Sequence, residues 1–155
     1  MEFTNILELK EYFKEARGLS IEETLQFRKD WRQAFAKGTK VLLHNCYRCG
    51  SNTRWNSYDW NHFKSNFYPI HDNSLQVINQ EPIPDLEEVI VFEEDCAVSA
   101  IVISFAELKK LLDGNNFKGD LYFTPRHFSW TLVFPYQDSL CGPFFVKNKV
   151  SLSLV

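Results

Sequence analysis

The sequence predicts an α+β fold, with a single domain over residues 1–155. We expect a largely antiparallel sheet of about five or six strands, together with two N-terminal helices and one or two short helices. Helix-like and strand-like segments do not alternate regularly, which argues against a doubly wound parallel sheet. Short turn-like segments join most of the strand-like runs, as in antiparallel hairpins. The composition, 45% hydrophobic and 24% charged over 155 residues, is typical of one globular domain.

Two helices are expected at the start of the chain. Over residues 5–17, apolar side chains recur at the spacing of a helix with one buried face. The second helix covers residues 20–36 and begins with a capping box, in which Ser20 and Glu23 bond each other's free backbone N–H groups.

Two arginines fall inside the apolar arc of the second helix, four residues apart. We expect Arg28 and Arg32 to extend their charged ends to the rim of the core or to pair with a carboxylate. The alternative is that the two guanidinium groups face an anionic group together.

The rest of the chain is expected to supply the sheet. The strand-like runs, rich in β-branched and aromatic residues, are residues 39–44, 88–93, 98–103, 120–124, 129–135 and 143–147. A short helix is expected over residues 57–67, and another over residues 105–112, where Ser104 and Glu107 form a second capping box. Residues 94–97 are expected to form a hairpin turn.

Charge is concentrated in one segment. The formal net charge of the chain is −3, whereas residues 81–120 alone carry −7. Within them, residues 81–95 contain seven acidic residues and no Lys or Arg. Such a segment is typical of a solvated loop and strand flank, and it would also steer a basic partner. The chain lacks the broad basic surface of a protein that binds duplex nucleic acid.

The sequence contains no apolar run near the roughly 20 residues of a membrane span. A basic segment followed by an apolar one, the pattern of a secretory signal, is also absent from the N-terminal residues. We therefore expect a cytoplasmic protein without a membrane partner. In that compartment the cysteines are expected to be reduced.

One pair of cysteines, Cys46 and Cys49, has the spacing of half a structural zinc site. A tetrahedral site needs two further ligands, and the sequence has no second pair at that spacing. We therefore expect ordinary reduced cysteines, with neither a metal nor a cofactor. A small metal-binding or enzymatic protein that uses Cys46 and Cys49 is the alternative.

A second stretch, residues 47–67, interleaves aromatic with cationic side chains. Exposed rings can stack on bases while cations follow phosphates, which suits a single-stranded RNA-binding module. Some of the rings also have helical spacing, which favours packing into a core. We expect the core role and keep RNA binding as a second alternative.

No nucleophile elbow, phosphate-binding loop or metalloprotease motif occurs in the chain, so no catalytic residue is expected. If a partner binds, we expect it on loop residues presented by rigid strands, where Trp and Arg would contribute most. This assumes that the loop at 45–60 and the turn at 124–128 lie at the same end of the sheet. The expected binding residues are Arg54, Trp55, Trp60, Arg126, His127 and Trp130.

The C-terminal third contains three related motifs: GDLYF at residues 119–123, FSWTLV at residues 128–133 and CGPFF at residues 141–145. They resemble the D-[IL]-Y, W-T-x-V and G-P-[YF]-F series of a family of small uncharacterised bacterial proteins, and the resemblance covers residues 87–146. Similar endings occur in small bacterial proteins suspected of being immunity- or antitoxin-like. The resemblance implies an α+β fold and a bacterial cytoplasmic setting, and it implies no activity.

The chain departs from that family pattern after the Trp strand. It has Pro-Tyr-Gln at residues 135–137, where the family often has Thr-His-Glu, and this lowers the case for an enzyme. We therefore expect a non-catalytic domain that binds another protein, with an immunity- or antitoxin-like role as a candidate. The acidic segment would suit a basic partner.

Overall fold

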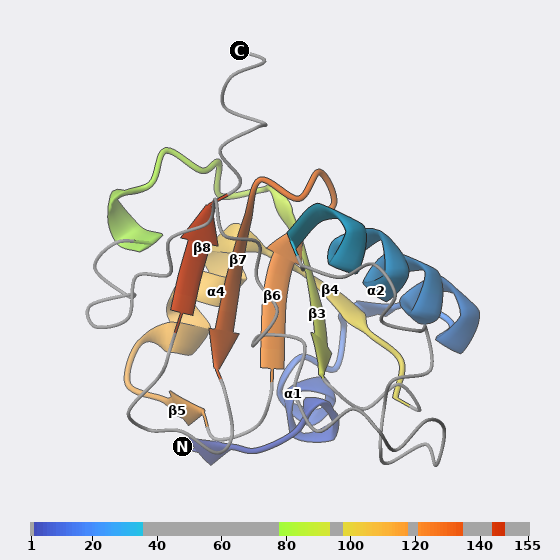
Figure 1. Cartoon of the computed structure of the whole chain (residues 1–155). Coiled ribbons are helices and arrows are strands. Elements are labelled where there is room, and N and C mark those ends of the chain that lie inside the picture. Colours follow the sequence, from blue (N-terminus) through green and yellow to red (C-terminus); the bar gives the residue numbers. More distant parts are fainter. Residues whose placement is uncertain (1, 36–77, 94–97, 118–120, 135–143, 148–155) are drawn as a thin grey trace.

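The computed structural model describes residues 2–35, 78–93, 98–117, 121–134 and 144–147. In these residues the chain has an α+β fold, built on a six-stranded antiparallel sheet (Figure 1). The strands are β1 (Glu2–Phe3), β2 (Arg17–Gly18), β3 (Glu88–Glu93), β4 (Ile101–Ser104), β5 (Asn116–Phe117), β6 (Leu121–Pro125), β7 (Trp130–Phe134) and β8 (Phe144–Lys147). The helices are α1 (Ile6–Tyr12), α2 (Ile21–Phe35) and α4 (Phe105–Leu112).

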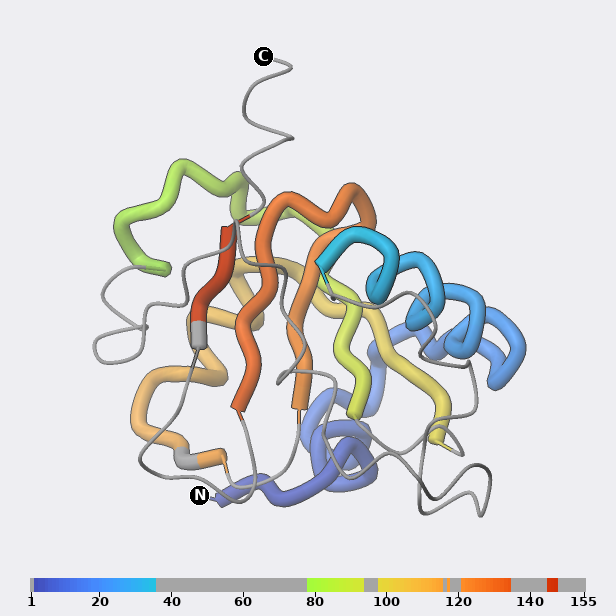
Figure 2. Tube along the Cα trace, viewed as in Figure 1, coloured from blue at the N-terminus to red at the C-terminus, as the bar shows by residue number. Residues whose placement is uncertain are grey.

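The strand order in the sheet is β2-β4-β3-β6-β7-β8, and every neighbouring pair is antiparallel. Strands β1 and β5 form a separate parallel pair, which joins the start of the chain to the segment after α4 (Figure 2). The prediction of an α+β fold with a largely antiparallel sheet is therefore confirmed. The expected strand at 39–44, helix at 57–67 and turn at 94–97 lie outside the described residues.

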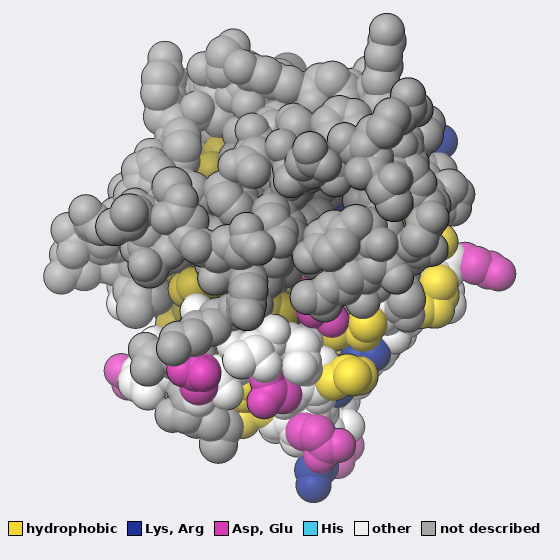
Figure 3. Space-filling model, turned by 60° about the horizontal axis from the view of Figure 1, so that its bottom comes forward, with side chains coloured by type: hydrophobic (Ala, Val, Ile, Leu, Met, Phe, Trp, Pro, Cys, Tyr) yellow, Lys and Arg dark blue, Asp and Glu magenta, His cyan; other side chains and the backbone are white. Residues whose placement is uncertain are grey.

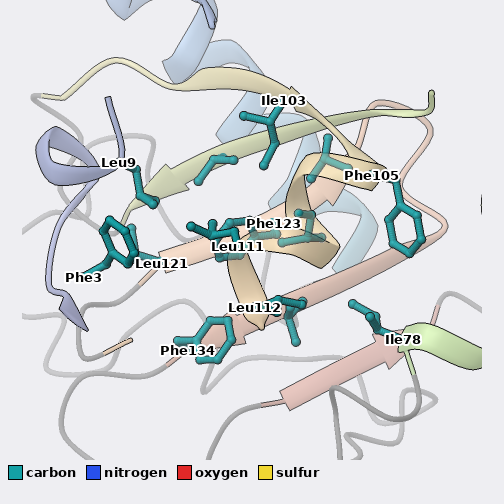
Figure 4. Packing of buried hydrophobic residues seen from close by; sticks show 14 of the residues in the cluster. Phe3, Leu9, Ile78, Ile103, Phe105, Leu111, Leu112, Leu121, Phe123 and Phe134 are labelled. Atoms are coloured by element: carbon teal, nitrogen blue, oxygen red, sulfur yellow. The ribbon is translucent and has the colours of Figure 1, made fainter. Parts of the chain in front are cut away.

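Both faces of the sheet are buried. In β3, Val89 and Val91 belong to one hydrophobic cluster, and Ile90 and Phe92 belong to the other. Helices α1 and α4 cover the first face (Figure 4), and α2 covers the second. Antiparallel sheets commonly leave one face in water, and the strands then alternate between apolar and polar residues. Here both sides need apolar residues, which explains the continuous apolar run in β3.

Helix α2 is attached to the sheet by a chain of buried hydrogen bonds. Trp31 Nε1 donates to Thr131 Oγ1 at 2.9 Å, and Thr131 Oγ1 donates to Thr124 Oγ1 at 3.3 Å. Thr124 Oγ1 in turn donates to the backbone oxygen of Trp130 at 2.7 Å. Each hydroxyl accepts one hydrogen bond and donates another. The hydroxyl groups of both buried threonines are therefore hydrogen-bonded, although they lie in an apolar layer.

The second predicted helix and its capping box are confirmed. Ser20 N donates to Glu23 Oε1 at 2.9 Å, and Glu23 N donates to Ser20 Oγ at 3.0 Å. The first helix is shorter than the predicted 5–17, because the chain leaves the helix after Tyr12 and pairs Arg17–Gly18 with β4. Within the described ranges, no helix has the length and hydrophobicity needed to cross a membrane.

The two arginines in the apolar arc of α2 do not reach the rim of the core. Arg28 is 2% exposed and Arg32 is 4% exposed. The guanidinium of Arg28 lies over the ring of Phe92, with its carbon 5.9 Å from the ring centre, which is a cation–π geometry. Helix α2 thus places the guanidinium of Arg28 against β3 of the sheet.

Replacing Thr131 with Val is expected to lower the free energy of unfolding by about 1–3 kcal/mol, because the buried indole N–H of Trp31 loses its acceptor while the shape is kept. Urea unfolding followed by circular dichroism measures this change through the midpoint. Thr131→Ser keeps the hydroxyl and is the control, which should lose less stability. A Val variant as stable as the original protein would show that this hydrogen bond does not stabilise the fold.

Candidate functional site

The turn between β6 and β7 presents two exposed side chains, Arg126 and His127. Phe128 N donates to Pro125 O at 3.1 Å, which closes the turn. Phe128 has a φ of 56°, in the left-handed region that a bulky residue adopts only when its surroundings hold it there. Its ring lies 5.1 Å from that of Phe27 on α2. The packing of Phe128 therefore holds the turn in place and directs Arg126 and His127 outward.

A carboxylate joins this turn to two strands. Glu88 accepts from Arg17 Nη2 at 3.0 Å through Oε2, and from Arg126 Nε at 3.1 Å through Oε1. The side chains of Arg17, Glu88 and Arg126 are 60%, 51% and 47% exposed, so water screens these ion pairs and each adds little stability. Their effect is to orient two guanidinium groups on one surface.

His127 has a carboxylate partner of its own. Its Nε2 lies 3.0 Å from Glu87 Oε1, with the His127 side chain 57% exposed and that of Glu87 only 19% exposed. A histidine held by a carboxylate is the arrangement of many general bases. In the part of the chain that the structure describes, however, no hydroxyl or thiol bonds the His127 ring. The pair therefore positions the imidazole and activates no nucleophile among these residues.

The first turn of α2 borders the same surface. The hydrogen bonds from Ser20 hold the pKa of the Glu23 carboxyl below its usual value, and the positive charges of Arg126 and Arg17 lower that pKa further. Arg126 of the turn and Arg17 of β2 therefore lower the pKa of Glu23 at the start of α2, and both also form ion pairs with Glu88.

An exposed leucine lies next to these charges. Leu86 is 87% exposed, directly before Glu87 and Glu88. The backbone on both sides of it is fixed, because the chain here is bonded to itself and to the start of α4. The bonds run from Glu87 N to Pro84 O at 3.1 Å, from Phe105 N to Glu87 O at 2.8 Å, and from Ala106 N to Asp85 O at 2.9 Å. We call Arg17, Leu86, Glu88, Arg126 and His127 the turn surface.

The structure places the six predicted binding residues differently. Arg126 and His127 are exposed and lie together on the turn surface. Trp130 does not, because it is 3% exposed and its ring packs 5.9 Å from Phe105 and 5.8 Å from Phe145. It points into the core because the sheet is covered on the face that its side chain occupies. Arg54, Trp55 and Trp60 lie outside the described residues.

The two alternative functions, a metal site or enzyme at Cys46 and Cys49 and an RNA-binding module at 47–67, depend on residues elsewhere in the chain. Cys46 and Cys49, like the RNA-binding candidate at 47–67, fall outside the described residues. Among the residues with a described position, no group of three or more His, Cys, Asp or Glu side chains is arranged to hold a metal ion.

Sequence reasoning missed Arg17, Leu86 and Glu88 as members of a site. It identified the acidic segment at 81–95, and the structure gives basic partners to several of its acids, three of them Lys or Arg and the fourth His127. The pairs are Glu81 with Lys147 at 3.0 Å, Asp85 with Lys109 at 2.7 Å, Glu87 with His127 at 3.0 Å and Glu88 with Arg17 at 3.0 Å. These acids therefore form a surface of mixed charge, which weakens the case for long-range attraction of a basic partner.

Replacing Ser20 with Ala is expected to raise the pKa of Glu23 partway toward its ordinary value, because it removes the side-chain hydrogen bond of Ser20, the second largest cause of the lowered pKa, and keeps the largest one, the bond from the Ser20 backbone N–H. A carboxyl whose pKa is lowered by folding stabilises the native state above its unfolded pKa, and this contribution is lost as the pH falls through the folded pKa. The variant should therefore lose less stability on acidification.

Carboxyl titration by NMR measures the pKa of Glu23 directly. Glu8 is the internal control, since Thr4 lowers its pKa by the same kind of bond and Ser20 does not contribute. A Glu23 pKa that is unchanged in the Ala variant would show that the Ser20 side chain does not contribute, and would assign the shift to the backbone N–H of residue 20 and to the charges of Arg126 and Arg17.

Comparison with known proteins finds no family model that matches the chain. No curated protein and no solved structure matches it either.

Proposed function

We propose that this chain is a non-catalytic protein-interaction domain that contacts its partner through the turn surface. The observation that carries the proposal is Leu86, a large apolar side chain that is 87% exposed on an anchored loop. A single exposed leucine is common on protein surfaces. What distinguishes Leu86 is the fixed backbone on both sides of it and the paired carboxylates of Glu87 and Glu88 that follow it in the chain.

The composition of the turn surface supports the proposal. Protein interfaces combine an apolar centre with a polar rim, and Arg is enriched in them. Leu86 supplies an apolar centre, and Arg17, Glu88 and Arg126 supply charged groups at its side. The partner that fits is a protein with a small apolar pocket and charges of both signs around it.

The rigidity of the turn surface also favours binding. Ordering a mobile loop on association costs free energy, and a loop already held in one conformation avoids that cost. Bonds from Glu87 and from the start of α4 hold the loop of Leu86, while packing of Phe128 against α2 holds the neighbouring turn. An immunity- or antitoxin-like role and a cytoplasmic setting, both expected from the sequence, are part of this proposal.

Leu86→Asp is expected to reduce partner capture by at least about tenfold, because a charge cannot enter an apolar pocket without losing its hydration. The test captures proteins from native lysate with RNase present and quantifies them by mass spectrometry. One stoichiometric protein should bind the original chain and disappear with the variant.

Leu7→Asp is the matched control. Leu7 is 58% exposed on α1, near the end of β3, whereas Leu86 precedes the start of β3 (Figure 1). Figure 3 shows the end of the molecule at which α1 lies, where hydrophobic and acidic side chains lie side by side. Capture that responds equally to both substitutions, or to neither, would contradict the assignment of the turn surface.

A further inference from the structure

One lysine of α1 is held against the sheet by a hydrogen bond to a serine. Lys10 Nζ donates to Ser99 Oγ at 2.7 Å, between residues 89 positions apart in the sequence. Lys10 lies in the last turn of α1, and Ser99 lies just before β4 begins. Both residues are partly exposed, and neither belongs to a hydrophobic core. The pair therefore lies at the surface of the described structure, where water and small solutes reach it.

The surroundings of Lys10 favour its neutral amine. Partial burial lowers the pKa of Lys10 below its usual value, because an ammonium group loses hydration on burial. The charge of Glu93, a buried residue at the end of β3, opposes this change without reversing it. At neutral pH a larger share of Lys10 is therefore unprotonated than of an ordinary lysine. Only the unprotonated amine has a lone pair that attacks an electrophile.

The hydrogen bond to Ser99 holds the amine in one position. A lysine side chain is a flexible chain of four carbons, so an unanchored amine samples many positions. The bond to Ser99 Oγ restricts Lys10 Nζ to the place where α1 meets the start of β4. A serine hydroxyl also accepts one proton while it donates another. Ser99 is therefore placed to take a proton from Nζ and to pass its own proton to water.

We propose that Lys10 and Ser99 form a modification site at which an acyl phosphate acylates Lys10 Nζ. The lone pair of Nζ attacks the carbonyl carbon and forms a C–N bond, while the bond from that carbon to the phosphate oxygen breaks. Inorganic phosphate leaves with the electron pair of that bond. Ser99 Oγ takes the proton that Nζ releases as its own proton passes to water. An acyl phosphate is small, and its leaving group needs no further activation.

Acylation changes the charge at the place where α1 is attached to the sheet. The product is a neutral amide, so the positive charge near Glu93 is removed. Each chain is modified once, which is compatible with a non-catalytic domain. The site lies near the end of β3, whereas the turn surface borders the start of that strand (Figure 1). The inference therefore goes beyond the proposed protein interaction and does not depend on it.

The test treats the full chain with acetyl phosphate and measures the initial rate of acetylation at each lysine by mass spectrometry of its peptides. Lys14 is the internal control, because it follows α1 in the same segment and is exposed. Lys10 should react at least about threefold faster than Lys14 at neutral pH, since the neutral share of an amine rises about tenfold for each unit by which its pKa falls. Exposure alone predicts the opposite order. A Lys10 rate equal to or below that of Lys14 would overturn the proposal.

The pH dependence separates the chemistry of the amine from its accessibility. The excess of the Lys10 rate should shrink between about pH 7 and about pH 10, because an ordinary lysine amine becomes largely neutral only over that range. An excess that does not change with pH would contradict the proposal.

Ser99→Ala removes the hydroxyl and should slow acetylation of Lys10 at least about threefold, as expected for the loss of one hydrogen bond, while the rate at Lys14 stays the same. Ser99→Thr keeps the hydroxyl and is the matched control, which should retain the faster rate. The dispersion of the amide NMR spectrum reports whether each variant folds. An unchanged Lys10 rate in the folded Ala variant would also overturn the proposal.

Discussion

Both faces of the antiparallel sheet are buried, so each residue of a central strand must fit one of two separate hydrophobic cores. Helices α1 and α4 complete one core, and α2 completes the other. The second core contains polar groups, and the chain from Trp31 through Thr131 and Thr124 satisfies three of them. These bonds also fix α2 against β6 and β7, and α2 in turn supports the turn that carries Arg126 and His127 through its contact with Phe128. The turn surface therefore depends on the same packing that closes the second core.

Local sequence signals were sufficient for part of this fold. The capping boxes at Ser20 and Ser104 are present as predicted, because each depends on side chains only three residues apart. The long strands were found from their apolar content. Strands of two residues, such as β2 and β5, have no periodicity to detect, and the early end of α1 follows from the pairing of β2 with β4. Those features depend on tertiary structure.

The candidate site could be predicted only in part for the same reason. The exposed position of Arg126 and His127 was predicted correctly, because a polar turn between two strands is visible in the sequence. Trp130 was placed on the surface because a strand that is apolar throughout does not show which face a given side chain takes. The contacts of Glu88 with Arg17 and Arg126 join residues 71 and 38 positions apart, and local sequence patterns contain no information about such pairs. The acids of the 81–95 segment illustrate the difference, since their number was evident from the sequence and their basic partners were not.

The connection between Trp31 and Thr131 spans 100 residues and therefore has a consequence for the synthesis of the chain on the ribosome. Helix α2 leaves the exit tunnel long before β6 and β7 exist, so Phe27, Trp31 and Phe35 have no sheet to pack against at that stage. Strand β2 likewise cannot form its hydrogen bonds until β4 has been made, and β1 cannot form its own until β5 has been made. Such long-range contacts slow folding, because loop closure must precede the contacts that stabilise it. Helix α2 thus exposes a row of aromatic side chains until β6 and β7 have been made, and this is the interval in which aggregation or chaperone binding is most favoured.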